Sequence, residues 1–436
     1  MRWFVAIVGS LLLIGTSALA QPRTTPPASN GQWPPLDATP VISSDRLPIP
    51  ETERPAPPQC PDLAWLTPPD EHRLWFTADL LLWWVKSAPL PQPLVTMGSA
   101  RDSIPGAPGQ PHTSVLFGQN NVGFGPASGV RLGVGGWFDA EYHWAAELNG
   151  FLLAEKQHRK MYESDGDNGI ALAQPIVIPG HGESAYDASL GGLTAGKFLV
   201  STSTQFGGWE LNGLRNLYRS DNLEFNLLGG FREVVLHETL MVNSDTIQRQ
   251  PNVLSFAGQP LGNVGDQISV GDRFRATTDF YGPQIGGKLS WTSNRFGIDF
   301  IGKVAMGVGH ETVSINGATW LLPAANNSMT VMPGGILAQS SNIGYYSRDV
   351  FAVVPEADLN FHYDLAPWAR LSLGGSFIYL SRAVRPGLVV DRNVEPGQVP
   401  SNPLFGQGSS GNSPTFLFRD SGYWAQGLNF GITIRY

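Results

Sequence analysis

Apolar and polar residues alternate with period two along most of the chain after residue 74. This period is typical of strands that bury one face. We predict ten strands, at 74–85, 128–138, 141–154, 200–215, 221–236, 276–292, 295–313, 349–363, 369–382 and 424–436. Soluble strands usually have about five or six residues, whereas tilted membrane strands need about 9–11. The segment lengths therefore favour strands that cross a membrane.

The connections between these segments alternate in length. Short connections lie at 139–140, 216–220, 293–294 and 364–368, and long ones at 86–127, 155–199, 237–275, 314–348 and 383–423. Outer-membrane barrels join their strands by short periplasmic turns and long external loops. We therefore predict an all-β fold, a transmembrane antiparallel up-and-down β-barrel of about ten strands, with twelve strands as the alternative.

The two faces of the predicted strands differ in polarity. Leu223, Phe225 and Leu227 alternate with Glu224 and Asn226. A face with this many charged and amide groups suits the lumen of a membrane barrel, and the apolar face suits lipid. The candidate lumen-lining residues are Asp79, Glu147, Glu210, Glu224, Arg232, Lys288, Asp299, Lys303, Glu356, Asp358 and Arg370.

The mixed signs of these charges leave two interpretations open. The side chains line a water-filled path that selects ions, or they pair with one another and fill the barrel. Eight strands leave an interior that side chains just fill, while about 16 leave a channel. Ten strands lie near the closed end of this range, so a narrow or blocked lumen is slightly favoured.

Aromatic residues gather near the ends of the predicted strands, a placement typical of the girdles that lie at the headgroup level. The expected girdle residues are Trp83, Trp84, Trp137, Tyr142, Trp144, Tyr218, Trp291, Tyr363, Trp368, Tyr423 and Trp424.

The last predicted strand has a distinct pattern. Leu428, Phe430, Ile432, Ile434 and Tyr436 alternate with small or polar residues up to the final position. An alternating strand that ends on an aromatic residue resembles the signal read by the barrel assembly machinery. An unpaired strand edge can be captured by β-augmentation and then removed by barrel closure.

The beginning of the chain predicts export. Arg2, an apolar run at 3–14 and Ala18-Leu19-Ala20 fit a cleavable signal peptide at 1–20. Residues 21–73 are rich in proline and lack periodicity, so we expect a periplasmic extension that is extended or disordered. The predicted barrel domain is 74–436.

Composition agrees with a surface that partly faces lipid. Only 15% of the residues are charged, against about 25% in soluble domains. The formal net charge of −8 excludes the basic field expected of a nucleic-acid binder. Cys60 is the single cysteine, so it forms no internal disulfide and belongs to no metal-ligand pattern.

Several motifs resemble the beta-barrel porin seven family, outer-membrane proteins abundant in planctomycete-type bacteria. The motifs are WFTADLLLWW at 75–84, PLVT at 93–96, ELNGLRN at 210–216, LLGGFR at 227–232, FYGPQIG at 280–286, GKVA at 302–305, VVPEA at 353–357 and RPG at 385–387. The resemblance spreads over about 74–436 and implies an outer-membrane barrel. It attaches no known chemistry to particular residues.

No residue pattern predicts catalysis. The Asp165–Gly169 stretch hints at a calcium loop, but Ile176 stands where an EF-hand needs glutamate. The histidines show no spacing typical of a nucleophile and its base. We therefore expect that the protein is not an enzyme and that it has no cofactor and no metal site.

The leading functional hypothesis is a porin-like protein of the bacterial outer membrane that passes small polar solutes or ions through a narrow polar lumen. The alternative is a structural or surface-interaction barrel with a plugged lumen and ligand-binding external loops. The expected partners are outer-membrane lipid, the barrel assembly machinery and small polar solutes, with no nucleic acid.

Overall fold

The computed structural model describes residues 73–326, 328–407 and 411–436. The predicted signal peptide at 1–20 and nearly all of the predicted extension at 21–73 lie outside the described residues. The first strand begins at Leu74, where the barrel domain was expected to begin. The described part of the chain has no helix that is long and apolar enough to cross a membrane.

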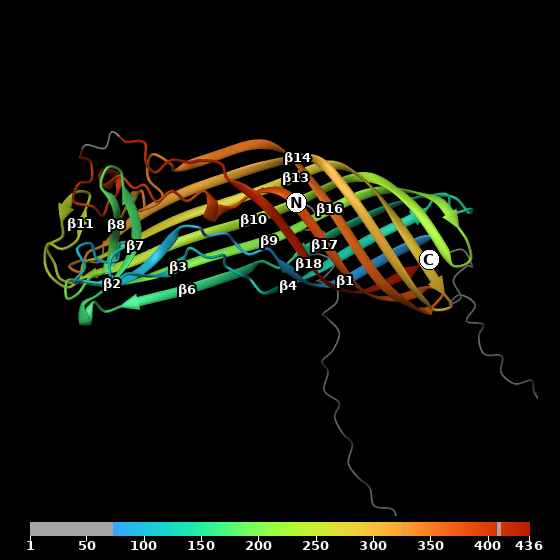
Figure 1. The fold of residues 1–436 in the computed structure, drawn as a ribbon, viewed down its shortest axis with the longest axis horizontal. Coiled ribbons are helices and arrows are strands. Elements are labelled where there is room, and N and C mark those ends of the chain that lie inside the picture. Colours follow the sequence, from blue (N-terminus) through green and yellow to red (C-terminus); the bar gives the residue numbers. More distant parts are fainter. Residues whose placement is uncertain (1–72, 327, 408–410) are drawn as a thin grey trace, which may run out of the picture. The chain divides into compact units, whose positions relative to one another are not determined.

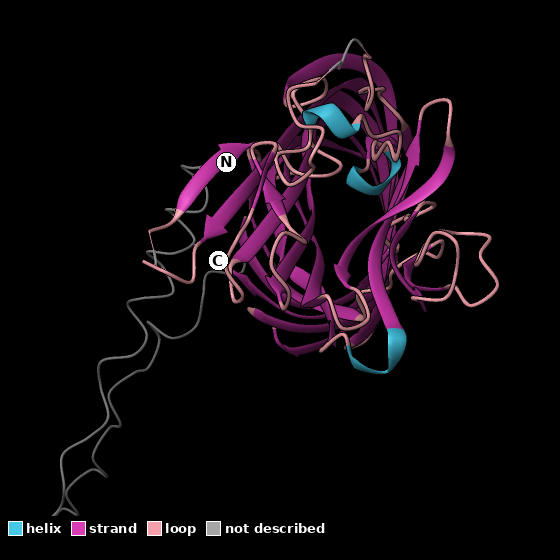
Figure 2. Cartoon of the chain, turned by 90° about the vertical axis from the view of Figure 1, so that its left-hand side faces the viewer, coloured by secondary structure: helices cyan, strands magenta, loops and turns pink. Residues whose placement is uncertain are grey.

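Ten antiparallel strands close a ring, which confirms the predicted barrel (Figures 1 and 2). In ring order they are β1 (Leu74–Val85), β4 (Pro126–Trp137), β5 (Trp144–Leu153), β9 (Thr194–Arg219), β10 (Leu223–Gln248), β13 (Gln267–Ser293), β14 (Phe296–Leu322), β16 (Gly344–Ala366), β17 (Ala369–Val384) and β18 (Asp420–Arg435). The ring closes where β18 pairs with β1, from Trp75 opposite Arg435 to Val85 opposite Ala425. Two further strands, β6 (Lys156–Ser164) and β15 (Thr330–Pro333), extend the sheet to twelve without entering the ring.

The connections alternate in length around this ring. Those at 138–143, 220–222, 294–295 and 367–368 are short and lie at one end, called the turn end here. The opposite, loop end carries a separate four-stranded sheet of β3 (Ser114–Gly118), β2 (Pro93–Ser99), β7 (Ile170–Ile178) and β8 (Gly182–Ser189). It also carries the hairpin β11 (Ser255–Phe256) with β12 (Gln259–Pro260), and the short helices η2 (Asp167–Gly169), η3 (Pro386–Leu388) and η4 (Pro396–Gln398).

Several strands are much longer than expected, which corrects the predicted loops. The strands β13 and β14 have 27 residues each, a length of about 90 Å along the strand. As a result, much of the expected loops at 155–199, 237–275 and 314–348 is strand. The connection between β10 and β13 is only 249–266, and the one between β14 and β16 is 323–343.

The physical reason is an inversion of the two faces along each long strand. Near the turn end of β10, Leu227 points outward with 40% of its surface exposed, while Arg232 points inward and is 3% exposed. Beyond Glu233 large apolar residues enter the inward positions, and Leu236 and Leu240 are buried while His237 faces outward. The period of two persists, but its apolar phase moves by one residue. A prediction based only on the outward apolar face therefore ends each long strand too early.

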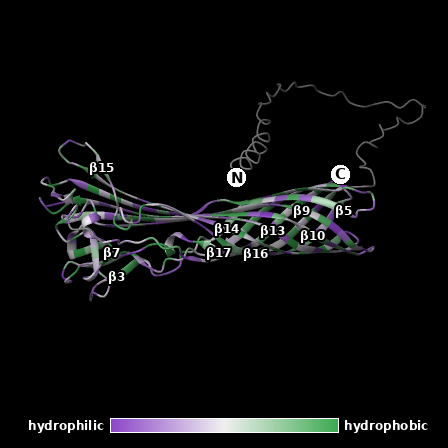
Figure 3. Cartoon of the chain, turned by 90° about the horizontal axis from the view of Figure 1, so that it is seen from above, coloured by the Kyte–Doolittle hydropathy of each residue, from purple (hydrophilic) through white to green (hydrophobic). Residues whose placement is uncertain are grey.

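The inversion divides the barrel into two halves. The membrane half, toward the turn end, has an apolar outer surface and a polar interior. Hydrophilic and hydrophobic residues alternate along its strands (Figure 3). The outer half, toward the loop end, has a polar outer surface and an apolar core, like a soluble barrel. Its wall consists mainly of β9, β10, β13, β14 and β16, and the connections 323–343 and 385–419 pack into the core.

A buried carboxylate holds the connection 323–343 on this core. Asp272 on β13 is 1% exposed and accepts hydrogen bonds from the backbone N–H groups of Ile336 (3.3 Å), Leu337 (3.0 Å) and Ala338 (2.9 Å). Burial nevertheless raises the pKa of the Asp272 carboxyl to about 6, although the three N–H groups favour its ionised form.

This pKa predicts that the connection is held more weakly at neutral than at acidic pH. A carboxyl with a raised folded-state pKa stabilises the fold fully below its unfolded pKa of about 3.9, and this contribution is lost as the pH rises through about 6. Two pKa units correspond to about 3 kcal/mol. After correction for intrinsic exchange, hydrogen exchange at 336–338 should show protection falling by roughly fiftyfold from pH 4 to pH 7. Asp272→Asn should flatten this profile, and an unchanged profile in that variant would contradict the assignment. The exposed control Asp349→Asn should leave it unchanged.

Candidate functional site

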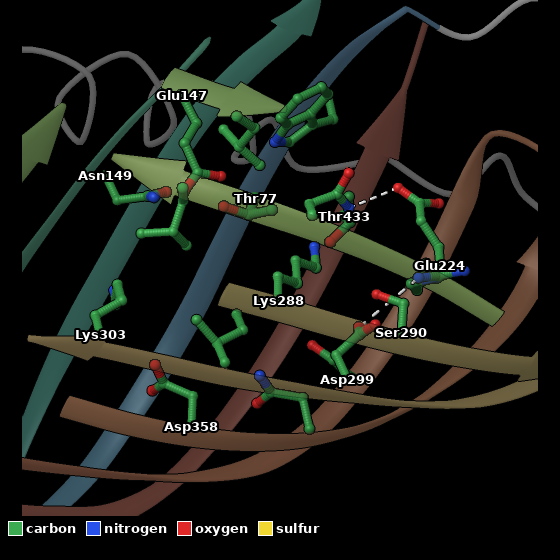
Figure 4. Close-up of a pocket in the computed structure, with 18 of the residues that line it drawn as sticks. Thr77, Glu147, Asn149, Glu224, Lys288, Ser290, Asp299, Lys303, Asp358 and Thr433 are labelled. Atoms are coloured by element: carbon green, nitrogen blue, oxygen red, sulfur yellow. Dashed lines mark hydrogen bonds and ion pairs between the residues drawn. The ribbon is translucent and has the colours of Figure 1, made fainter. Parts of the chain in front are cut away.

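The membrane half contains a cavity of about 590 Å³ that extends to the residues of the short turns. Its wall comes from all ten ring strands, because inward-facing polar residues repeat at every second position of each strand. The structure places every candidate lumen-lining residue around it: Asp79, Glu147, Glu210, Glu224, Arg232, Lys288, Asp299, Lys303, Glu356, Asp358 and Arg370. In Figure 4, Glu147, Lys288 and Lys303 come from different strands and surround the same space.

Four of these residues form a closed ionic network across the barrel. Lys303 Nζ lies 2.7 Å from Glu210 Oε1 and 3.1 Å from Glu356 Oε1. Arg232 Nη2 lies 3.0 Å from Glu210 Oε2 and also contacts Glu356 directly. Each carboxylate therefore meets both cations, and all four side chains are buried. Buried charges need such compensation, since an unpaired one is strongly destabilising.

A second group extends the network to the other side of the barrel. Arg131 on β4 lies 3.3 Å from Asp358 and 3.9 Å from Glu356. Asp358 also accepts a hydrogen bond from Ser376, whose hydroxyl oxygen accepts one from Asn429 at 2.7 Å. Charged and hydrogen-bonded groups from opposite walls are thus joined across the lumen.

The remaining predicted residues lie closer to the turns. Asp299 lies 3.2 Å from His362 and 3.9 Å from Arg370, which itself pairs with Asp364 at 2.6 Å. Glu224 pairs with Arg219 at 3.0 Å. Glu147 accepts a hydrogen bond from Asn212 at 3.2 Å, and Asp79 and Lys288 face the cavity. These groups line the part of the cavity next to the short turns, which we call the vestibule, and they do not belong to the ionic network.

An aromatic layer crosses the barrel interior on the loop-end side of the charges. The ring centroids of Trp83 and Phe151 are 5.4 Å apart, those of Phe151 and Phe206 are 5.4 Å apart, and those of Phe206 and Tyr423 are 5.0 Å apart. All four side chains are buried in one apolar cluster inside the barrel. Trp83 Nε1 donates a hydrogen bond to Asn429 at 2.8 Å, which ties this layer to the polar network.

Trp83 and Tyr423 were expected in the lipid-facing girdles, and this expectation is wrong for both. Neighbouring residues on a strand point to opposite faces, so only one member of Trp83-Trp84 and of Tyr423-Trp424 can face lipid. Trp84 is 42% exposed, whereas Trp83 and Tyr423 are fully buried. The adjacent aromatic pairs are the sequence signal that could have revealed the aromatic layer.

A buried ion pair lies farther along the axis. Arg385 on the connection 385–419 forms a two-point ion pair with Glu238 on β10, with one N–O distance of 2.7 Å. The same guanidinium donates to the carbonyl of Ser87 at 3.1 Å and lies 5.2 Å from the centre of the Tyr423 ring. This buried pair fixes the connection inside the barrel mouth.

The predicted assembly signal lies on the last strand. Leu428, Phe430, Ile432 and Ile434 are on the outward face of β18, which pairs with both β1 and β17, and Tyr436 follows the strand. Its recognition by assembly machinery stays a prediction.

Among the residues that the structure describes, Asp139, Glu141 and His143 are close enough together to hold a metal ion. Asp139 already accepts hydrogen bonds from the backbone of His143 and Trp144. These bonds account for the carboxylate as a turn-forming group.

Some solved outer-membrane proteins resemble the chain at low similarity. The outer membrane protease OmpT from Escherichia coli matches with 10% identity and a TM-score of 0.38, over 84% of this chain and 97% of that one. The toluene transporter TodX from P. putida matches with 9% identity and a TM-score of 0.19, over 84% and 90%. A FadL homologue from Pseudomonas aeruginosa matches with 7% identity and a TM-score of 0.21, over 84% and 90%. At these values the likeness carries no argument about function.

The sequence itself places the chain in a family. No curated protein matches it. The profile of the beta barrel porin-7 family (BBP7) matches residues 75–436, which include all ten ring strands except Leu74, the first residue of β1. The closed ring and the apolar outer surface of the membrane half, called the apolar belt, agree with this match. The match places the protein in the bacterial outer membrane, and the chain belongs to the beta barrel porin-7 family.

Proposed function

We propose that this protein is a closed outer-membrane barrel that anchors its outer half at the cell surface and is not an open pore. The observation that carries the proposal is the sequence of closures along the axis: the ionic network, the aromatic layer and the Arg385–Glu238 pair. Each joins side chains from different walls of the barrel. Short turns face the periplasm in outer-membrane barrels, so the loop end faces outward.

The proposal assigns the barrel a structural role and no catalytic activity. Its apolar belt contacts outer-membrane lipid, and β18 serves as the signal for the assembly machinery. The outer half then supplies the surface for contacts outside the cell, which corresponds to the surface-interaction alternative drawn from the sequence.

Passage of small polar solutes or ions is the second candidate function. The charged vestibule, part of the cavity of about 590 Å³, supports it, because charged side chains that line a lumen can bind ions and tune their selectivity. The two candidates differ in whether the aromatic layer parts to admit water.

Planar-bilayer recordings of the purified protein distinguish them. The closed-barrel proposal predicts no conductance steps at any voltage, because buried side chains from all ten ring strands fill the barrel at the level of the aromatic layer. Heat-modifiable migration on gels should verify that the inserted protein is folded, and an open porin in the same bilayers serves as the positive control. Reproducible steps from folded protein would overturn the proposal in favour of solute passage.

A further inference from the structure

An indole ring lies flat on the wall of the cavity near the short turns. Gly135 on β4 is the cross-strand partner of Trp75 on β1, and a Cβ at Gly135 would overlap two atoms of the Trp75 ring. Because both atoms belong to the six-membered part of the indole, this part lies directly over the glycine. Trp75 also lines the cavity, so the opposite face of its ring is left for a ligand.

Polar side chains beside this ring use the same arrangement. A Cβ at Gly133 would overlap the side-chain oxygens of Thr77 and Asn149, its partners on the two neighbouring strands. Gly374 makes the same room for the amide oxygen of Asn360. Since glycine occupies these inward positions, the polar side chains lie along the wall and the space between the walls stays open.

Several uncharged side chains of this wall have hydrogen-bonding groups that the protein does not use. In the described part of the chain, the hydroxyl groups of Thr77 and Ser372 and the amide of Asn360 form no side-chain hydrogen bond. Among the charged groups nearby, Arg219 is already paired with Glu224 at 3.0 Å. A ligand with several uncharged hydroxyl groups can therefore bond to this wall without breaking an ion pair.

The size and the position of the cavity limit the ligand further. Ligand pockets measure about 300–1,000 Å³, so the cavity of about 590 Å³ has room for a molecule the size of a disaccharide. The cavity extends to the short turns, and short turns face the periplasm in outer-membrane barrels. A ligand of this site therefore comes from the periplasm.

We propose that the vestibule binds a small neutral saccharide, with one sugar ring against the indole of Trp75. The C–H bonds of a sugar ring are weakly positive, and the face of an aromatic ring is negative. Thr77 lies two residues along the same strand, and Asn149 and Ser372 flank it from β5 and β17. Sugar hydroxyls donate and accept, as the amide and hydroxyl groups of these side chains do. The site is independent of conductance, because it needs an opening at the turn end only.

Isothermal titration of the full-length protein tests the site, in a detergent that has no sugar headgroup. The neutral probes are cellobiose, maltose and N,N′-diacetylchitobiose. We expect at least one of them to bind with a Kd below about 1 mM. Its affinity should change less than twofold when NaCl is raised from about 0.1 M to about 0.5 M, because salt screens charges and the probe has none. Chitobiose, which carries ammonium groups in place of two hydroxyls of cellobiose, serves as the charged comparison.

Substitutions at the indole test whether the probe binds where we propose. Trp75→Ala should lower the affinity at least tenfold, whereas Trp75→Phe keeps an aromatic face and should lose only a few-fold. Gly135→Ala should also cost at least tenfold, because its Cβ forces the Trp75 ring off the wall and into the cavity. The control Trp144→Ala removes an indole that is 51% exposed and does not line the cavity, so binding should be unchanged. Heat-modifiable migration shows whether each variant is folded.

Three outcomes would overturn the proposal. The first is an absence of binding of all three neutral probes to folded wild-type protein. The second is an equal affinity in Trp75→Ala and Trp144→Ala, which would place the probe outside the vestibule. The third is binding of chitobiose alone with a strong dependence on salt, which would make the vestibule an ion site.

Discussion

Replacement of Glu356 by alanine should destabilise the barrel by about 3–5 kcal/mol. Glu356 is buried and meets both Arg232 and Lys303, so its removal leaves two buried cations with Glu210 as their main partner. Urea unfolding in lipid vesicles, followed by tryptophan fluorescence, measures the free-energy change.

A charge-balanced double variant separates the lost charge from the lost side chain. Glu356→Gln with Lys303→Met removes one anion and one cation together, so it should recover most of the stability. The exposed control Glu163→Ala should change the free energy of unfolding by no more than about 0.5 kcal/mol. If Glu356→Ala were as stable as that control, the ionic network would not hold the barrel closed.

Phe206→Ala should have an effect of similar size, about 3–5 kcal/mol, through loss of packing. The Phe206 ring lies between Phe151 and Tyr423 and is 1% exposed, so truncation leaves a void at the centre of the aromatic layer. The same urea titration measures it. Because the void lies in the layer that separates the two ends, transient conductance steps in bilayers should accompany the loss of stability.

Phe138 offers a matched control for this truncation. It lies in a short turn with 73% of its surface exposed, so Phe138→Ala should change stability by no more than about 0.5 kcal/mol. Equal losses in the two variants would show that the aromatic layer contributes no specific packing.

The membrane half could be predicted from the sequence because each strand residue faces one of two environments, the lipid or the polar interior. Lipid selects apolar side chains such as Phe300 and Leu359 on one face, and the interior selects charged ones such as Lys303 and Asp358 on the other. This contrast marks the strands, their number and the lumen-facing residues.

The strands of the outer half could not be predicted in the same way, because the environment outside them is water and no longer lipid. Water replaces lipid around it, so polar residues such as Thr277 and Arg275 stand where apolar ones would otherwise continue. The pairing of Arg232 with both Glu210 and Glu356 also depends on distances between strands far apart in the sequence. Alternation predicts that these residues face inward, but it does not state which partners meet.

The inversion of faces also fixes how deeply the barrel sits in the bilayer. On β13 the outward side chains change from Tyr281 to Asp279 and then to Arg275. Moving the barrel deeper into the bilayer would place these charges in hydrocarbon, which costs about 2–4 kcal/mol for an arginine at the midplane. Moving it outward would expose the apolar belt to water. From Tyr281 to Gln267 the strand runs about 45 Å, which at a tilt of about 40° is a rise of about 35 Å. The four-stranded sheet at the loop end is therefore held at a set height above the lipid headgroups.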